Sequence, residues 1–174
     1  MSDFWSCVTE HEVGVIVMLT GLVEGDMVKC ARYWPDPATR NLILGDFEVT
    51  AEEEIRDGDD IILTRLGVTQ VDEEVGANAR HVIHIQVKGW GDHSVPDNTS
   101  TLLHSIKRVQ DLAKSKRFVQ VLLRSKYNPG FSSRFSSPSP VLVHCSAGVG
   151  RTGTWIAVYR LVMITESTNV VTHD

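Results

Sequence analysis

The sequence predicts one α/β domain in which helices flank a twisted, mixed β-sheet. Three observations support this fold class: short β-branched segments typical of strands, apolar residues at helical spacing, and Gly, Asp and Pro residues between them. A length of 174 residues suits one domain. With 42% hydrophobic and 22% charged residues, the composition is globular and excludes a disordered or membrane-embedded chain.

The first elements are a short helix and a buried strand. The pair Ser2-Asp3 is suited to cap a helix over Phe4–His11. Val13–Leu19 is short and β-branched, as expected of a buried strand. Its apolar stretch is too short to span a bilayer, and acidic residues precede it, which disfavours a signal peptide. Lys29–Tyr33 is expected to form another strand, which nearby prolines end.

Four strands of a mostly antiparallel region are predicted in the middle of the chain. They cover Leu42–Leu44, Phe47–Thr50, Ile61–Leu66 and His81–Val87, and Gly- and Asp-rich turns separate them. Alternate side chains of a strand point to opposite faces. His81, Ile83, Ile85 and Val87 therefore share one face, and Val82, His84 and Gln86 share the other.

The C-terminal part returns to helical spacing. Apolar residues from Leu102 to Ala113 recur at helical intervals, and Asn128–Pro140 is a Ser- and Pro-rich loop. Val141–Val143 is a short apolar strand. The segment from Thr152 to about Thr165 is apolar almost all round, which predicts a buried helix.

The segment Val141–Gly153 (VLVHCSAGVGRTG) carries the chemistry. A strand would deliver His144 and Cys145 to a loop of small residues that turns into a helix near Arg151. Backbone N–H groups and the helix dipole favour an anion there, and an arginine can grip a phosphate with two hydrogen bonds. The same environment lowers a thiol pKa and makes Cys145 a nucleophile. The alternative, an inert core cysteine, leaves the glycines and Arg151 unexplained.

This segment resembles a known signature. His144–Gly153 is similar to the H-C-x5-R-S/T-G loop of protein tyrosine phosphatases. Asp3–Val8, Lys29–Pro35 (KCARYWP) and Trp90–Pro96 (WGDHSVP) resemble, in order and spacing, segments of the tyrosine-specific branch. The resemblance covers most of the chain and disfavours the low-molecular-weight and dual-specificity branches.

The resemblance implies a role for each loop residue. Cys145 would be the nucleophile that forms a phosphocysteine, His144 would help to keep it ionised, and Thr152 would assist departure of the thiolate. The phosphate would be held by the Arg151 side chain and by the backbone of Ser146, Ala147, Gly148, Val149, Gly150 and Arg151.

Trp90–Pro96 resembles the family's mobile acid loop and implies that Asp92 is the general acid. Trp90 is expected to be a hinge or packing residue. Gly91 replaces the usual proline, and Gly has more conformations to lose when a loop closes. We therefore expect less favourable closure and slower turnover.

The remaining expectations concern partners and surroundings. Phosphotyrosine proteins are the expected substrates, and no cofactor or metal is needed. The net charge of −5 argues against nucleic-acid binding. Cys7 and Cys30 are expected in the core, and the absence of a disulfide framework favours a reducing, cytoplasmic location.

Two further features differ from the family pattern. The family often has a Glu after Trp-Pro that bonds the loop arginine, and Asp36 is the nearest acid to that place. The family's domain also extends further at both ends, so residues 1–174 are expected to be a partial catalytic domain, truncated at both ends. Two functions stay open: an active phosphatase, or an impaired phosphatase-like domain that binds phosphotyrosine peptides.

Overall fold

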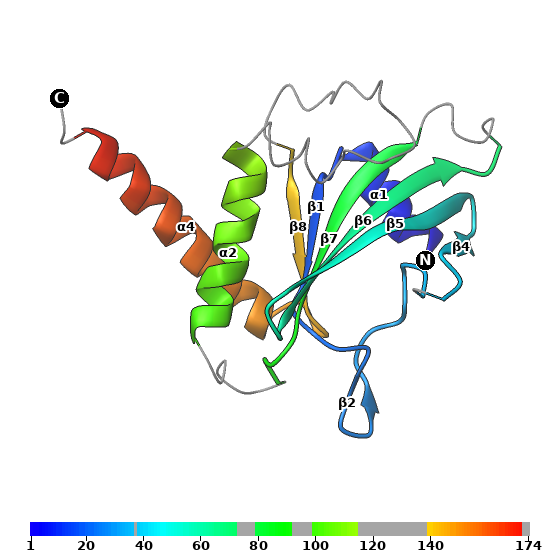
Figure 1. Cartoon of the computed structure of the whole chain (residues 1–174), viewed down its shortest axis with the longest axis horizontal. Coiled ribbons are helices and arrows are strands. Elements are labelled where there is room, and N and C mark those ends of the chain that lie inside the picture. Colours follow the sequence, from blue (N-terminus) through cyan, green and yellow to red (C-terminus); the bar gives the residue numbers. More distant parts are fainter. Residues whose placement is uncertain (37, 73–78, 92–98, 115–138, 172–174) are drawn as a thin grey trace.

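The fold is built on a six-stranded mixed sheet. In the computed structural model, residues 1–36, 38–72, 79–91, 99–114 and 139–171 are described. The strand order is β4-β5-β6-β7-β1-β8 (Figure 1). The strands are β1 (Val15–Met18), β4 (Asn41–Leu44), β5 (Phe47–Asp57), β6 (Ile61–Gln70), β7 (Arg80–Val87) and β8 (Val141–His144), and a separate hairpin pairs β2 (Val23–Glu24) with β3 (Met27–Val28).

The sheet changes from antiparallel to parallel pairing at β7. Strands β4 to β7 pair antiparallel, whereas β1 pairs parallel to both β7 and β8. In this register Ile16 of β1 lies opposite His84 of β7, and Met18 lies opposite His144 of β8. The twisted mixed sheet is therefore confirmed. Because β1 and β8 are parallel, both end at the same edge of the sheet, where the loop after His144 begins.

Helices cover both faces of the sheet. In Figure 1, α2 (Thr99–Lys114) and the start of α4 (Gly150–Val171) lie on one face, and α1 (Ser2–Glu10) lies on the other. The first face holds a core that includes Ile85, Ile106 and Trp155. The second holds Trp5, Tyr33, Trp34 and their neighbours. Strand residues alternate between the two cores as predicted: Ile83, Ile85 and Val87 join the first and Val82 the second.

Two N-terminal predictions need correction. The α1 helix begins at Ser2, whose hydroxyl bonds Asp46 at 3.3 Å instead of capping the helix. Lys29–Tyr33 was predicted as a strand, but this fully described segment has no regular structure. The N–H groups of Lys29 and Cys30 both bond the Leu22 carbonyl, which closes the β2–β3 hairpin and leads the chain inward to the buried Tyr33.

The prediction that the apolar C-terminal helix is buried is only partly right. Trp155 of α4 is buried, and its indole N–H donates to Ser105 of α2 at 2.9 Å. However, Ile156, Leu161 and Ile164 are exposed. In the described part of the chain one side of α4 packs inward, with Val158, Tyr159 and Val162 against the first core and Met163 in contact with Gln110 of α2. The apolar pattern runs all round the helix, but the sheet and α2 cover only one side of it.

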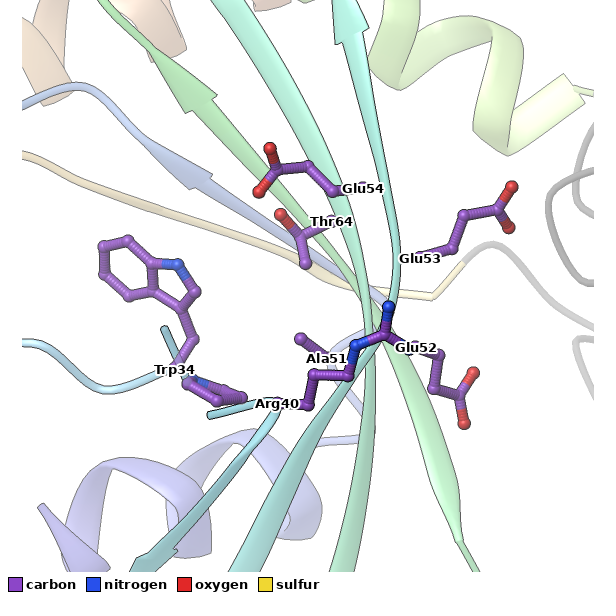
Figure 2. Close-up of a pocket in the computed structure, with 8 residues that line it drawn as sticks. Trp34, Arg40, Ala51, Glu52, Glu53, Glu54 and Thr64 are labelled. Atoms are coloured by element: carbon purple, nitrogen blue, oxygen red, sulfur yellow. The ribbon is translucent and has the colours of Figure 1, made fainter. Parts of the chain in front are cut away.

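Strand β5 is longer than predicted and carries an acidic recess. Its charged part, Glu52–Arg56, continues the strand past an irregularity between Ala51 and Glu53. The carboxylate of Glu52 pairs with the buried Arg65 at 2.6 Å. Figure 2 shows the recess, which lies beside β5 and β6. Its lining is Trp34, Pro35, Arg40, Ala51, Glu52, Glu53, Glu54 and Thr64, and three carboxylates make it unfavourable for a phosphate.

Candidate active site

The candidate site is the loop between β8 and α4. Cys145 is buried at its base, whereas residues 146–150 are exposed to solvent. The Leu19 N–H donates to the His144 carbonyl at 2.8 Å and ties the end of β8 to β1. Gly148 has a φ of +72°, a conformation that side chains other than glycine rarely adopt. The chain thus reverses within a few residues and enters α4 at Gly150.

The Cys145 sulfur is surrounded by hydrogen-bond donors. The Thr152 hydroxyl, the backbone N–H groups of Thr152 and Gly148, and the charge of Arg151 all favour its ionised form. Burial by itself would raise the pKa of the Cys145 thiol, but these donors and this charge together lower it below its usual value. The environment therefore favours the thiolate, which is the nucleophilic form.

Arg151 is held in place by two acceptors. Its side chain is 4% exposed, and Nη1 donates to Glu24 Oε1 at 2.6 Å and to the Trp90 carbonyl at 2.8 Å. Fixing Nη1 from two directions sets the plane of the guanidinium before any ligand binds. A preorganised planar fork loses little entropy when it binds a phosphate.

Glu24 is a site residue that the sequence prediction missed. The same Oε1 also accepts from the Thr20 hydroxyl at 3.0 Å and from the Gly21 N–H at 3.1 Å. Burial would raise the pKa of Glu24, but the hydrogen bonds and the charge of Arg151 lower it overall, so the carboxylate is ionised. Asp36, the acid nearest to the place where the family often has a Glu, pairs instead with the neighbouring Arg32. Glu24 reaches Arg151 because the β2–β3 hairpin follows directly after β1.

We expect Glu24→Gln to weaken binding of inorganic phosphate at this site by about tenfold or more, because a charge-assisted hydrogen bond contributes about 1.5–3 kcal/mol. The amide keeps the size of the side chain but removes the charge that orients Arg151. Isothermal titration calorimetry measures the change, with the exposed Glu10→Gln as the matched control. Equal affinity in wild type and Glu24→Gln would contradict this role.

His144 faces away from the loop and into the core. Its Nδ1 lies 3.1 Å from the Cys145 carbonyl oxygen, and its Nε2 lies 2.7 Å from the Tyr33 hydroxyl. The same hydroxyl lies 2.8 Å from Nε2 of His84. Burial lowers the pKa of His144, so the neutral ring is favoured. Tyr33 and His84 were not predicted as site residues, although Tyr33 lies in the KCARYWP segment.

The acid-loop prediction falls mostly outside the described residues. Trp90 is buried beside the α2 and α4 residues of the first core, and Gly91 is exposed. Asp92 and the rest of the loop to residue 96 lie outside the described residues, as do residues 128–138 of the predicted Ser- and Pro-rich loop. What the structure does place is the start of this loop, because the Trp90 carbonyl accepts from Arg151.

The other cysteines differ from Cys145. Cys7 was expected in the core but is exposed, because Trp5 and Val8 form the inward face of α1. Cys30 is partly buried, and burial raises the pKa of its thiol. Among the described residues no group of three or more His, Cys, Asp or Glu could hold a metal ion. Those residues also include no helix long and apolar enough to cross a membrane.

Comparisons with known proteins show the family to which the chain belongs. The family model for protein-tyrosine phosphatase matches residues 1–173. Human receptor-type tyrosine-protein phosphatase C is 36% identical over 171 residues, which are 98% of this chain and 11% of that protein. Tyrosine-protein phosphatase 1 of Dictyostelium discoideum is 34% identical over 167 residues, 89% of this chain and 28% of that protein.

A solved structure has the same fold. The catalytic domain of human protein tyrosine phosphatase non-receptor type 18 superposes with a TM-score of 0.71 at 31% identity, over 95% of this chain and 50% of that one. The chain therefore belongs to the protein-tyrosine phosphatase family. It spans about half of that solved domain and a smaller share of the two relatives.

Proposed function

We propose that this chain carries the catalytic loop of a protein tyrosine phosphatase and hydrolyses phosphotyrosine in proteins through a cysteinyl-phosphate. The observation that supports this most directly is the surrounding of Cys145. A thiol that lies among the Thr152 and Gly148 donors and beside a fixed arginine has a lowered pKa and is suited to attack phosphorus.

In the first step, the Cys145 thiolate forms a bond to phosphorus while the bond from phosphorus to the tyrosyl oxygen breaks. Negative charge is spread over the three equatorial oxygens in the transition state. The Arg151 guanidinium and the backbone N–H groups of residues 146–151 stabilise that charge, and the N-terminus of α4 adds its dipole.

Asp92 is proposed to protonate the tyrosyl oxygen as it leaves. A phenol has a pKa of about 10, so a neutral leaving group forms far more easily than a phenolate at neutral pH. Trp90 precedes Asp92 by two residues and bonds Arg151 directly, which supports this role for Asp92.

In the second step, a water attacks the phosphorus of the cysteinyl-phosphate, and the bond between phosphorus and sulfur breaks. Asp92, now ionised, accepts a proton from this water. The Thr152 hydroxyl, which helps to lower the pKa of the Cys145 thiol, is proposed to stabilise the departing thiolate. The products are inorganic phosphate and the restored Cys145 thiolate.

We further propose that residues 1–174 are part of a larger catalytic domain, with a phosphate-binding loop at 144–153 and an acid loop at 90–96. A neighbouring solved structure is described as PTPN18 in complex with HER2 phosphopeptides, at 31% identity and a TM-score of 0.67. That likeness supports phosphotyrosine-containing proteins as partners. A cytoplasmic location fits the reduced thiol that this chemistry requires.

We expect Asp92→Ala to slow hydrolysis of a phosphotyrosine peptide by about 10²–10⁴-fold, the usual contribution of a positioned general acid. The effect should be much smaller for an aryl phosphate whose phenol is strongly acidic, because such a leaving group needs no proton. Steady-state kinetics on both substrates measure the difference, with the exposed Asp59→Ala as control. An equal loss on both substrates would contradict the role of Asp92.

The same assay separates the enzyme from an impaired binding domain. Wild type that releases no more phosphate than Cys145→Ser, yet binds the phosphotyrosine peptide, would contradict the proposed hydrolysis. Release of phosphate from phosphoserine peptides at a comparable rate would contradict tyrosine specificity.

A further inference from the structure

A buried chain of hydrogen bonds connects two strands behind the phosphate-binding loop. His84 of β7 and His144 of β8 point to the same face of the sheet, with β1 between them. Neighbouring strands are about 4.8 Å apart, so the two backbones are about 10 Å apart and the rings cannot bond directly. The Tyr33 hydroxyl fills the gap, at 2.8 Å from His84 Nε2 and 2.7 Å from His144 Nε2.

The partners determine where each proton lies. The Cys145 carbonyl only accepts, so Nδ1 of His144 carries a hydrogen and donates to it. In the neutral ring Nε2 is then an acceptor, and the Tyr33 hydroxyl donates to it. Because Tyr33 has one hydrogen, its oxygen must accept from His84, which therefore carries its hydrogen on Nε2. All three bonds run in one direction, from His84 towards Cys145.

The surroundings keep His84 neutral. It is completely buried, its ring lies 4.5 Å from the Trp34 ring, and its Nε2 contacts Tyr33. Burial, and to a smaller extent His144, lowers the pKa of His84 to about 3. The other titratable groups of this cluster are Tyr33, whose pKa is raised well above its usual value by burial and by Cys30, and Cys30 itself. A neutral His84 is a permanent donor to Tyr33 at physiological pH.

We propose that His84 is a positioning residue for the nucleophile, acting through Tyr33 and His144 to hold the Cys145 backbone in its thiolate-stabilising arrangement. Its role in catalysis rests on the proposed function, but its effect on the thiol does not. With the His84 donor in place, Tyr33 must donate to His144, and His144 must donate to the Cys145 carbonyl.

Without the His84 donor, the direction of these hydrogen bonds would no longer be determined. Tyr33 could then accept from Nε2 of His144, and Nδ1 without a hydrogen would face the Cys145 carbonyl, two acceptors in contact. Cys145 would lose the bond that fixes its carbonyl and polarises the following peptide group. Because the amides of this loop stabilise the thiolate, the pKa of the Cys145 thiol should rise.

The test compares two substitutions of His84. Phenylalanine retains a ring but has no donor, whereas glutamine has an N–H₂ group near the place of Nε2. We expect His84→Phe to move the thiolate titration upward by about 0.5–1 pH unit, a three- to tenfold smaller thiolate fraction below the pKa. His84→Gln should stay within about 0.3 unit of wild type.

The measurement is thiolate absorbance near 240 nm against pH. For each protein, the absorbance of the same protein that also carries Cys145→Ser is subtracted, which removes the contribution of the other thiols. Nitrogen-15 shifts of His144 report its tautomer, and His11→Phe, an exposed histidine, is the control substitution. We expect His144 to keep its hydrogen on Nδ1 in wild type and His84→Gln, and to become mixed in His84→Phe. Circular-dichroism melts identify any variant that fails to fold. If His84→Phe fails to fold, His84→Leu, which also has no donor, replaces it in the comparison with His84→Gln.

An unchanged titration and tautomer in folded His84→Phe would overturn the proposal, as would an equal shift in His84→Gln, which would indicate loss of packing. Neither readout requires turnover. An inactive wild type with a shifted His84→Phe titration would therefore overturn the proposed function and leave this inference supported.

Discussion

Replacing Cys145 by serine should reduce hydrolysis of a phosphotyrosine peptide by at least about 10⁴-fold, in line with the loss of other covalent nucleophiles. The hydroxyl of serine remains protonated where the thiol of Cys145 is ionised, because the donors around the sulfur lower the pKa of a thiol that is already acidic. Arg151 and the loop amides are unchanged, so binding of the peptide should stay within about threefold of wild type.

The rate of hydrolysis is measured by phosphate release at fixed times, and the affinity for the peptide by fluorescence anisotropy of a labelled phosphopeptide. Cys7→Ser is the matched control, since Cys7 is an exposed thiol on the outer side of α1. Its activity should equal that of wild type. A Cys145→Ser variant with more than about one hundredth of wild-type activity would contradict covalent catalysis at this residue.

Arg151→Lys should lower kcat/KM by about 10²–10³-fold, the usual effect of removing a preorganised donor at a developing charge. A lysine retains the charge but has no planar fork. One ammonium cannot reproduce the two bonds from Nη1 to Glu24 and Trp90 and also bind two phosphate oxygens. Substrate binding and the transition state both lose stabilisation, so KM should rise and kcat should fall.

Arg160→Lys is the control for this substitution, because Arg160 is an exposed residue further along the same helix. It should change kcat/KM by less than about twofold, as expected of a surface substitution. Thermal melts of both variants separate catalysis from stability. If Arg151→Lys retained more than about a third of wild-type kcat/KM, bidentate grip of the phosphate would be excluded.

The loop from His144 to Gly153 was predictable because its parts are neighbours in the chain. A short apolar strand, small residues and an apolar helix follow one another, and local geometry alone directs their N–H groups towards one point. The sheet was predictable for a related reason, since the period-2 pattern of β7 assigns its residues to two cores. The exposure of Ile156 and Leu161 was not predictable. An apolar helix pattern shows that burial would be favourable, but it does not show whether other elements cover every side of the helix.

The supporting contacts depend on residues that are far apart in the sequence. Glu24 and Arg151 are separated by 127 positions, and Tyr33 and His144 by 111. Which acid reaches the arginine depends on where the β2–β3 hairpin lies, and neither Glu24 nor Asp36 has a local pattern that distinguishes it. The correct acid is therefore visible only after the sheet has brought β1 next to β8.

The sequence by itself determined the chemistry of this protein: a cysteine, a loop of small residues and an arginine in one short segment, placed between a strand and a helix. Only the tertiary structure decided how that chemistry is held ready, with Glu24 and Trp90 orienting Arg151 and with Tyr33 and His84 supporting His144. The physical reason is the separation of the residues along the chain. Nucleophile and loop are joined by a few covalent bonds, whereas their supports arrive through the pairing and packing of the whole sheet.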